Sequence, residues 1–493
     1  MPSEQALRAA PRAATAVRLL DGALWLLLGA LLVEVFFEPW VQNLLATRHA
    51  PPDAGSSAVL PEWPKTLKSV LYLALLAVTV AKFTLARRWR ELRTPADLVL
   101  VALGLVMIVA GLVGGSSPGL IGDALFVYFR GVLVFYGWRA LRPAWPQVVP
   151  LLWLVGAILG ANVAVALVQM VVGTPSYQAL GWVDLSWSRT YRAQGLLDHP
   201  NHLGHALALA LLGLLAWFVT RERVPAAWWA VFGVFAFALS ATQSRESAGG
   251  FLAGAVLIGV LRRRWRPVVA GAVAVVLLFG VQLALRPANR TELLRRLAGV
   301  FSAIQVPSGD EGTPDYCIEG HEGNENCATI VPQREIRLLY AQQGLRLLMR
   351  QPVLGYGVGQ FGGIVAEKND PDWNLDPRFG PGGFDMHDST QQQVDTFWLH
   401  LVVEVGLVGL VLYLVWLALV ARPLLPIARR GPPDIPAALS SWALAALLFG
   451  VLVAFLSPAL EDPLFPPLLF TVLGLAWVFS TRAPQTDDGS AGV

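Results

Sequence analysis

The sequence predicts an all-α polytopic membrane protein with about twelve transmembrane helices, because apolar runs long enough to cross a bilayer recur along it. Hydrophobic residues make up 55% of the chain and charged residues only 14%, well below the charged content of an average soluble domain. A single long polar stretch, 287–396, interrupts the apolar pattern. We therefore expect a helical membrane protein with one large extramembrane loop, in which recognition or chemistry takes place.

The expected spans divide the chain into four parts. Nine fall within residues 1–286, at 17–37, 66–86, 96–114, 119–137, 147–171, 203–220, 225–243, 248–261 and 267–286. The large loop, 287–396, separates them from three more within residues 397–482, at 397–421, 436–457 and 463–480. The remaining stretch, 483–493, is polar and is predicted to be a disordered cytoplasmic tail.

Arginine clusters predict the orientation of these spans. They precede the first span and follow the second, fourth, sixth, eighth and tenth. When spans alternate across the bilayer, all of these clusters lie on one side, which is the positive-inside pattern. Both termini are thus expected in the cytoplasm and the large loop on the outer face. Such clusters set topology and contact lipid headgroups, so they do not indicate a nucleic-acid partner.

Both cysteines, Cys317 and Cys327, lie in the large loop, and an oxidising compartment such as the periplasm would join them in a disulfide. Closing so short a loop would stabilise it by roughly 3 kcal/mol. The intervening His321 does not complete a zinc-ligand pattern. Three other histidines recur at intervals of three residues but lack the supporting acids of a metal site: His199, His202 and His205. No metal site is therefore expected.

Two local structures are expected inside the large loop. Residues 334–351, REIRLLYAQQGLRLLMRQ, have the apolar spacing of an amphipathic helix that Pro352 ends. The following GYGVGQF, which begins at Gly355, resembles a phosphate-binding glycine loop. Because it neither follows a strand nor opens a helix, it is predicted to be a tight turn.

Three arginines near the expected membrane edge are candidate functional residues, because charge is costly there. With alternating spans, Arg192, Arg245 and Arg337 all approach the outer face from separate parts of the sequence. Guanidinium groups grip pairs of oxygens, so three of them suit a ligand with several negative charges, such as a diphosphate. The alternative is that each arginine only pairs with a nearby acid, such as Asp198 or Glu246.

Four motifs occur in order between residues 191 and 409: RAQG at 192–195 with HPNHLG at 199–204, SRESAGG at 244–250, Arg337 followed by PVLGYGVGQF at 352–361, and VDTFWLHLVVEVGLVG at 394–409. In this order and topology they resemble the O-antigen ligase and Wzy-type polymerase superfamily of bacterial membrane glycosyltransferases. The resemblance implies a GT-C-like helical fold in the bacterial inner membrane, with the large loop in the periplasm.

The resemblance also implies a reaction. The donor would be a glycan linked to polyprenyl (undecaprenyl) diphosphate, and the acceptor a sugar hydroxyl. The transfer would be inverting, with no metal and no cofactor, so arginines would stabilise the leaving diphosphate. Arg192 and Arg245 would bind that diphosphate together with Asn201 and Ser244 of the same motifs, and Arg337 would assist. Chain-length regulators and flippases would be the protein partners.

The sequence does not decide which residue is the general base, because the chain departs from the family's ligase pattern. Ligases carry His-Asn before the ExGxxG helix, whereas this chain has Val394 and Asp395 there. Asp395 would serve as a desolvated base, or His387 would reach in from the loop, or Asp395 would only cap the next helix. The departure favours a polymerase of O-antigen or exopolysaccharide repeat units; a ligase that transfers the glycan to lipid A core is the alternative.

Two other classes of protein compete with an enzyme. A transporter or lipid-linked glycan flippase would also have about twelve spans, but carriers of that size place their long loop centrally, on the cytoplasmic side. A scaffold protein would not need an arginine set near the membrane edge.

Overall fold

The computed structural model describes residues 4–49, 61–285, 336–386 and 393–481, and over these ranges it contains helices and turns but no β-strand. Cys317, Cys327 and His387 lie outside the described residues. The disulfide and a catalytic His387 therefore stay predictions, as do the domain boundaries.

Each of the twelve expected spans coincides with a helix of the structure. These helices are α1 (Glu4–His49), α2 (Trp63–Leu85), α3 (Pro95–Val113), α4 (Pro118–Leu141), α5 (Trp145–Val172), α8 (Pro200–Phe218), α9 (Ala226–Thr242), α10 (Arg245–Arg262), α11 (Trp265–Leu285), α15 (Phe397–Ala421), α17 (Ile435–Val453) and α18 (Phe465–Thr481). Among the described residues, nine helices are long and apolar enough to cross a membrane, and α9 and α18 are shorter apolar helices. The predicted class, an all-α polytopic membrane protein, is confirmed.

Helix starts follow local sequence signals. Thr94 accepts a hydrogen bond from the Asp97 amide, and the Asp97 side chain accepts one from Thr94 in return, which satisfies two exposed N–H groups at the start of α3. Ser117 caps α4 in the same way, by accepting from the Leu120 amide. Both helices then have proline at their first position, where its missing N–H costs nothing.

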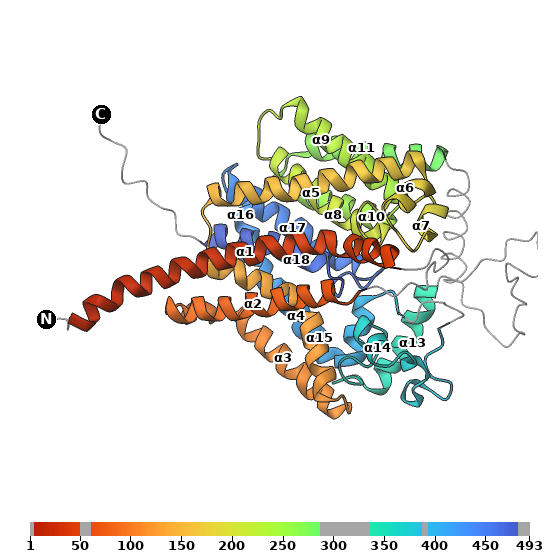
Figure 1. The fold of residues 1–493 in the computed structure, drawn as a ribbon, viewed down its shortest axis with the longest axis horizontal. Helices are drawn as coiled ribbons and strands as arrows, with labels where there is room; N and C mark the ends of the chain where they lie inside the picture. The colour runs from red at the N-terminus through yellow and green to blue at the C-terminus, as the bar shows by residue number, and fades with distance from the viewer. Residues whose placement is uncertain (1–3, 50–60, 286–335, 387–392, 482–493) are drawn as a thin grey trace, which may run out of the picture.

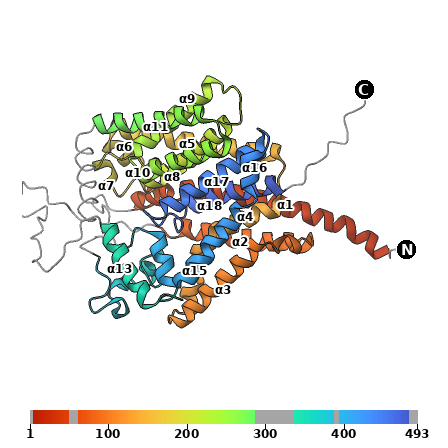
Figure 2. The same ribbon diagram turned by 180° about the vertical axis from the view of Figure 1, so that it is seen from behind.

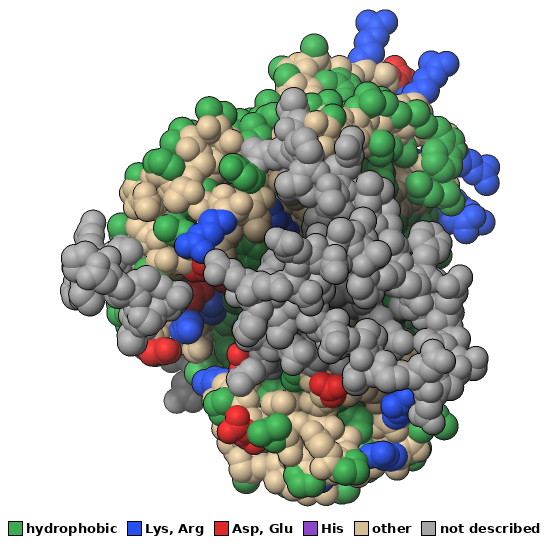
Figure 3. Space-filling model, turned by 90° about the vertical axis from the view of Figure 1, so that its right-hand side faces the viewer, with side chains coloured by type: hydrophobic (Ala, Val, Ile, Leu, Met, Phe, Trp, Pro, Cys, Tyr) green, Lys and Arg blue, Asp and Glu red, His purple; other side chains and the backbone are tan. Residues whose placement is uncertain are grey.

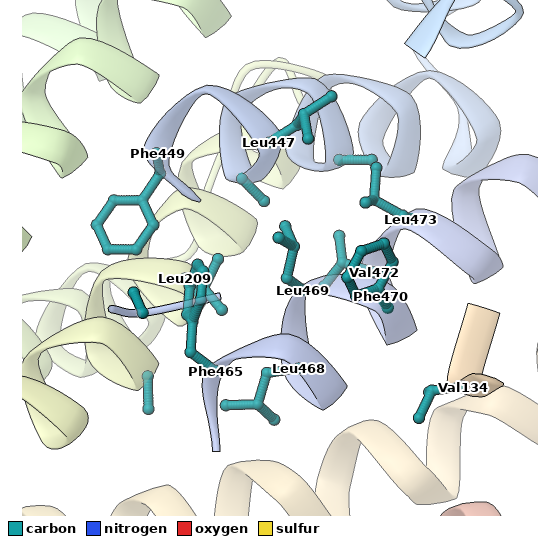
Figure 4. Close-up of a cluster of buried hydrophobic side chains, with 14 of the residues drawn as sticks. Val134, Leu209, Leu447, Phe449, Phe465, Leu468, Leu469, Phe470, Val472 and Leu473 are labelled. Carbon is teal, nitrogen blue, oxygen red and sulfur yellow. The ribbon is translucent and has the colours of Figure 1, made fainter. Parts of the chain in front are cut away.

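The helices form one elongated bundle (Figure 1). The helices α17 and α18 run through its middle, with α5, α8, α9, α10 and α11 on one side and α2, α3 and α4 on the other, as the view from behind also shows (Figure 2). Figure 4 shows the packing at the centre, where Phe449 and Leu447 of α17 meet Phe465 and Leu469 of α18. Leu209 reaches this cluster from α8.

Short helices gather at the end of the bundle opposite the start of α1 (Figure 1). They are α6 (Thr174–Ala179), α7 (Ser186–Arg189), α13 (Ile336–Arg350) and α14 (Ile364–Asn369), with the 3-10 turns η3 (Trp373–Leu375) and η4 (Pro377–Phe379) following in the sequence. Seen end-on in Figure 3, side chains of both charge signs are visible on this end. We refer to it as the loop end.

The amphipathic helix expected at 334–351 is confirmed as α13. Its buried face, Tyr340, Gly344 and Leu347, packs against α15. Gly344 is required there, because a Cβ at this position would lie 2.1 Å from a methyl group of Leu399. This helix therefore places Arg337 beside the first turn of α15.

Arginines at the other end of the bundle bind the ends of neighbouring helices. Arg88, after α2, donates to the Ala140 carbonyl at the end of α4. Arg264 donates to Val219 after α8, and Arg262 donates to Ala428 of α16 (Leu424–Arg430). The clusters that the sequence analysis assigned to one side of the membrane therefore contact one another at these helix ends.

Candidate functional site

The RAQG segment is held in place by α5. Gln169 accepts hydrogen bonds from the amides of Gln194 (3.1 Å) and Gly195 (2.8 Å) and donates to the Gly195 carbonyl (2.9 Å). Asn162 accepts from the Leu196 amide at 2.9 Å. Gly195 has a φ of +67°, which favours glycine, and any Cβ there would meet Asn162 Oδ1 at 2.8 Å. The backbone after Arg192 is thus fixed by buried amide side chains.

The connection between α9 and α10 binds the same segment from the other side. The Ala193 amide donates to the Ala241 carbonyl at 3.0 Å, and Gln243 Nε2 donates to the Tyr191 carbonyl at 3.1 Å. Gln243 lies two residues before Arg245, so these bonds bring the RAQG and SRESAGG motifs together at the loop end.

Arg192 is oriented by three contacts. Its Nε donates to the Thr242 carbonyl at 3.0 Å, and its Nη2 donates to Asn201 Oδ1 at 2.6 Å. The guanidinium carbon lies 5.2 Å from the centre of the Trp187 ring, in a cation–π contact. The structure therefore brings Arg192 and Asn201 together, as the sequence analysis expected of one binding site.

Ser244 and Arg245 have different surroundings. Ser244 is buried, and its hydroxyl caps α10 by accepting from the Ser247 amide, so its described contacts are structural. Arg245 is the first residue of α10 and is exposed. The cap fixes the backbone from which the Arg245 side chain leaves.

Arg337 and Asp395 form an ion pair. Arg337 Nη2 lies 3.0 Å from Asp395 Oδ2, and both side chains are about two-thirds buried, at 29% and 34% exposure. Burial raises the pKa of Asp395 above its ordinary value; the Arg337 guanidinium opposes this shift, and the Glu246 carboxylate adds to it. Asp395 does not cap α15, because Thr396 occupies the cap position.

The segment PVLGYGVGQF (352–361), which we call the glycine motif, packs against the ExGxxG motif of α15 (404–409). Within α15, Gly406 has φ +65° and ψ −169°, which breaks the helix. The backbone around this break bonds to the glycine motif in both directions. The amides of Tyr356 and Gly357 donate to the carbonyls of Val403 and Glu404, and the Leu407 amide donates to the Pro352 carbonyl. The break therefore leaves these backbone groups satisfied, as the membrane interior requires.

The tight turn predicted for GYGVGQF is confirmed, because Gly355, Gly357 and Gly359 all have positive φ. Glu404 holds this turn against α15. One of its carboxylate oxygens accepts from the Phe361 amide at 3.1 Å, and the other accepts from the Tyr128 hydroxyl at 2.9 Å. Glu404 therefore joins the glycine turn, α15 and α4 through its two carboxylate oxygens.

Replacing Gly406 by alanine is expected to destabilise the protein by on the order of 3 kcal/mol, because only glycine adopts this backbone conformation readily. An added Cβ would also lie 2.2 Å from the Val353 carbonyl oxygen. The measurement is the thermal unfolding temperature in detergent. Gly156→Ala in α5 is the matched control, since a Cβ there meets nothing within 4 Å. Equal unfolding temperatures for the two variants would contradict the fit between the motifs.

Four acidic partners of the histidines complete the polar network. Asp198 and Asp462 contact His202 at 2.6 and 2.8 Å. Folding also brings Glu246 within 3.1 Å of His205. Glu461 contacts His400 at 2.8 Å. Glu461 and Asp462 were missed because they lie in a connection of only a few residues, although adjacent charges at a membrane edge are themselves a signal.

These contacts set the charges at the loop end. Both ring nitrogens of His202 contact a carboxylate, an arrangement that only the imidazolium can satisfy with two donors. Although burial opposes its ionisation, the charge and hydrogen bond of His202 hold the pKa of Asp462 below its ordinary value. Burial, together with the positive charges of His202 and Arg192, lowers the pKa of His199 to about 3. Nδ1 of His199 accepts from the Asn201 amide, which positions the Arg192 partner.

Within the described residues, no group of three or more histidine, cysteine or acidic side chains is arranged to hold a metal ion. The described site is therefore built from arginines, carboxylates and paired histidines. Such a set can bind an anion and accept a proton.

Part of the chain is similar to a known protein family. Residues 230–414 match the family model described as O-antigen ligase. The matched range includes Arg245, Arg337, Asp395 and the Gly406 break, whereas Arg192 and Asn201 precede it. No curated protein matches the chain significantly. Over residues 230–414 this multi-pass membrane protein is therefore similar to the O-antigen ligase family, and the similarity supports glycosyl transfer in polysaccharide biosynthesis.

Proposed function

We propose that this protein is an inverting, metal-independent glycosyltransferase of the bacterial inner membrane. It transfers a glycan from a polyprenyl diphosphate to a sugar hydroxyl at the periplasmic face, and so polymerises O-antigen or exopolysaccharide repeat units. The observation that carries the proposal is the pair of oriented arginines at one end of the bundle: Arg192 held by Asn201 and Thr242, and Arg337 held by Asp395.

The arginines serve the leaving group. The acceptor oxygen attacks the anomeric carbon, the bond from that carbon to the diphosphate oxygen breaks, and the electron pair leaves with the diphosphate. Arg192 and Arg245 bind the diphosphate and Arg337 assists, so negative charge develops next to fixed positive charge. The guanidinium of Arg192 stacks against Trp187, and a planar guanidinium held in this way can donate hydrogen bonds to two oxygens of the diphosphate.

Asp395 is the proposed general base. It accepts the proton of the acceptor hydroxyl as the new glycosidic bond forms. Its raised pKa supports this role, because a carboxylate of higher pKa is a stronger base. His387 directly follows Met386, the last described residue before the gap at 387–392, and is kept as the alternative base.

Product analysis in proteoliposomes tests the proposal. Purified protein is supplied with native polyprenyl-linked repeat units, and the lipid products are separated by size. A ladder of lengthened polyprenyl-linked chains with free polyprenyl diphosphate is expected. Sugar moved onto lipid A core would instead identify a ligase, and movement of donor across the bilayer without bond formation would identify a flippase. A chain-length regulator is the expected partner that narrows the ladder.

Topology is tested separately. In a variant whose two cysteines are replaced by serine, a single cysteine at Met349, an exposed residue of α13, is expected to react with an impermeant maleimide on intact spheroplasts. A single cysteine at Arg223, between α8 and α9, is the control and is expected to react only after the membrane is broken. The reverse pattern would overturn the periplasmic placement of the site and the cytoplasmic placement of both termini.

A further inference from the structure

Two consecutive acids, Glu461 and Asp462, connect parts of the site that are far apart in the sequence. Glu461 Oε1 lies 2.8 Å from His400 Nδ1 of α15, and Asp462 Oδ2 lies 2.8 Å from His202 Nε2 of α8. Both acidic side chains are buried, with 2% and 5% of their surface exposed. The short connection between α17 and α18 therefore contacts two helices with adjacent side chains.

The contact between Glu461 and His400 leads to the part of the site that contains Arg337 and Asp395. Nε2 of His400 lies 2.7 Å from the carbonyl oxygen of Val394, the residue before Asp395. The other ring nitrogen of His400 contacts Glu461. His400 therefore links the backbone beside Asp395 to the α17–α18 connection.

The contact between Asp462 and His202 leads to the part of the site that contains Arg192 and Asn201. His202 follows Asn201, whose side chain accepts the hydrogen bond from Arg192. The second ring nitrogen of His202 contacts Asp198, so the first turn of α8 is fixed on both sides of the imidazole. A shift of Asp462 would therefore move the residue that orients Arg192.

The connection itself is well fixed. The amides of Glu461 and Asp462 both donate to the Pro458 carbonyl, at 2.8 and 3.2 Å. Asp462 also accepts from the Leu464 amide at 2.7 Å through its other oxygen. Gly363 leaves room for Glu461, since a Cβ there would lie 2.7 Å from Glu461 Oε2. These contacts make the two carboxylates a rigid unit.

Stability alone is a weak reason for such a unit. Buried ion pairs cost much of their attraction in desolvation, and apolar residues of similar volume often stabilise a protein as well. What two ion pairs on adjacent residues do provide is a fixed geometry between the helices that they join.

We propose that Glu461 and Asp462 are positioning residues that set the separation between the diphosphate-binding half of the site, Arg192 and Asn201, and the base-bearing half, Arg337 and Asp395. The proposal rests on the proposed function. The reaction needs the base and the leaving-group arginines at a fixed spacing across one anomeric carbon, and a misplacement of about 1 Å can cost a hundredfold in rate.

The test measures distance and rate on the same variants, Glu461→Gln and Asp462→Asn. Spin labels are attached to cysteines at Thr190, beside Arg192, and at Met349 of α13, in a chain with serine at Cys317 and Cys327. The interspin distance distribution is expected to shift or broaden in both variants. Turnover is expected to fall by about a hundredfold, while KM for the donor changes much less. Glu222→Gln, an exposed acid between α8 and α9, is the matched control and is expected to change neither.

The outcomes separate cleanly. An unchanged distance distribution overturns the proposal, whether or not turnover falls. A changed distribution with unchanged turnover overturns the catalytic importance of the spacing. The interspin distance is measured without substrate, so it tests the positioning role even if the wild-type protein forms no glycosidic bond. Absence of glycosidic bond formation by the wild-type protein would refute only the proposed function. Should Asp462→Asn fail to fold, the combined Asp462→Asn and His202→Gln variant, which leaves an uncharged hydrogen-bonding pair, is measured in its place.

Discussion

An Arg192→Lys variant is expected to lose about a hundredfold or more in turnover, nearly as much as Arg192→Ala. Lysine keeps the positive charge but lacks the planar group that donates to Thr242 and Asn201 and also grips a diphosphate. Arg245→Lys is expected to behave in the same way, because lysine again replaces the planar group with a single charged amine. The measurement is product formation by each purified variant, with native donor at saturating concentration.

The matched control is Arg189→Lys, an exposed arginine of α7 three residues before Arg192. It is expected to keep wild-type turnover. Unfolding temperatures are measured in parallel, because Arg192 also bonds to the protein itself. Near-wild-type turnover in both Arg192→Lys and Arg245→Lys would refute the diphosphate role. Turnover lost together with a large fall in unfolding temperature would assign these arginines to the fold.

Asp395→Asn is expected to reduce turnover by about a hundredfold to ten-thousandfold, the usual contribution of a general base. Asparagine keeps the size and an acceptor for Arg337 but does not take a proton. Asp372→Asn, an exposed acid of the same region, is the control and is expected to have no effect. If Asp395→Asn stays active while His387→Gln is inactive, the base is His387 and the assignment to Asp395 is wrong.

The pH dependence gives a second measurement of the same residue. A general base must be ionised, so turnover is expected to fall as the pH falls through the pKa of Asp395. Because burial raises that pKa, the midpoint of the fall should lie above the ordinary range of an aspartate. In Asp395→Asn this acidic limb should disappear from whatever activity remains. A limb that persists unchanged in the variant belongs to another group.

Much of the architecture was determined by the sequence alone. The apolar runs predicted each of the twelve long helices, because a segment in a bilayer must satisfy its own backbone hydrogen bonds and has no stable alternative to a helix. The amphipathic pattern predicted α13, and the glycines of GYGVGQF predicted a turn, because both are local properties of the chain. Arg192 and Asn201 were expected in one site, and a nine-residue separation already kept them close.

Only the tertiary structure decided how the motifs meet. Nothing near Gly406 indicates that its helix is broken, or that the freed backbone groups bond to residues about fifty positions earlier. In the sequence, Glu461 and Asp462 lie in what looks like an ordinary short loop. In the folded protein Asp462 contacts His202, 260 residues away, and Glu461 contacts His400, 61 residues away. Local preference depends on neighbours in the chain, whereas a buried charge takes its partner from whichever helix packs beside it.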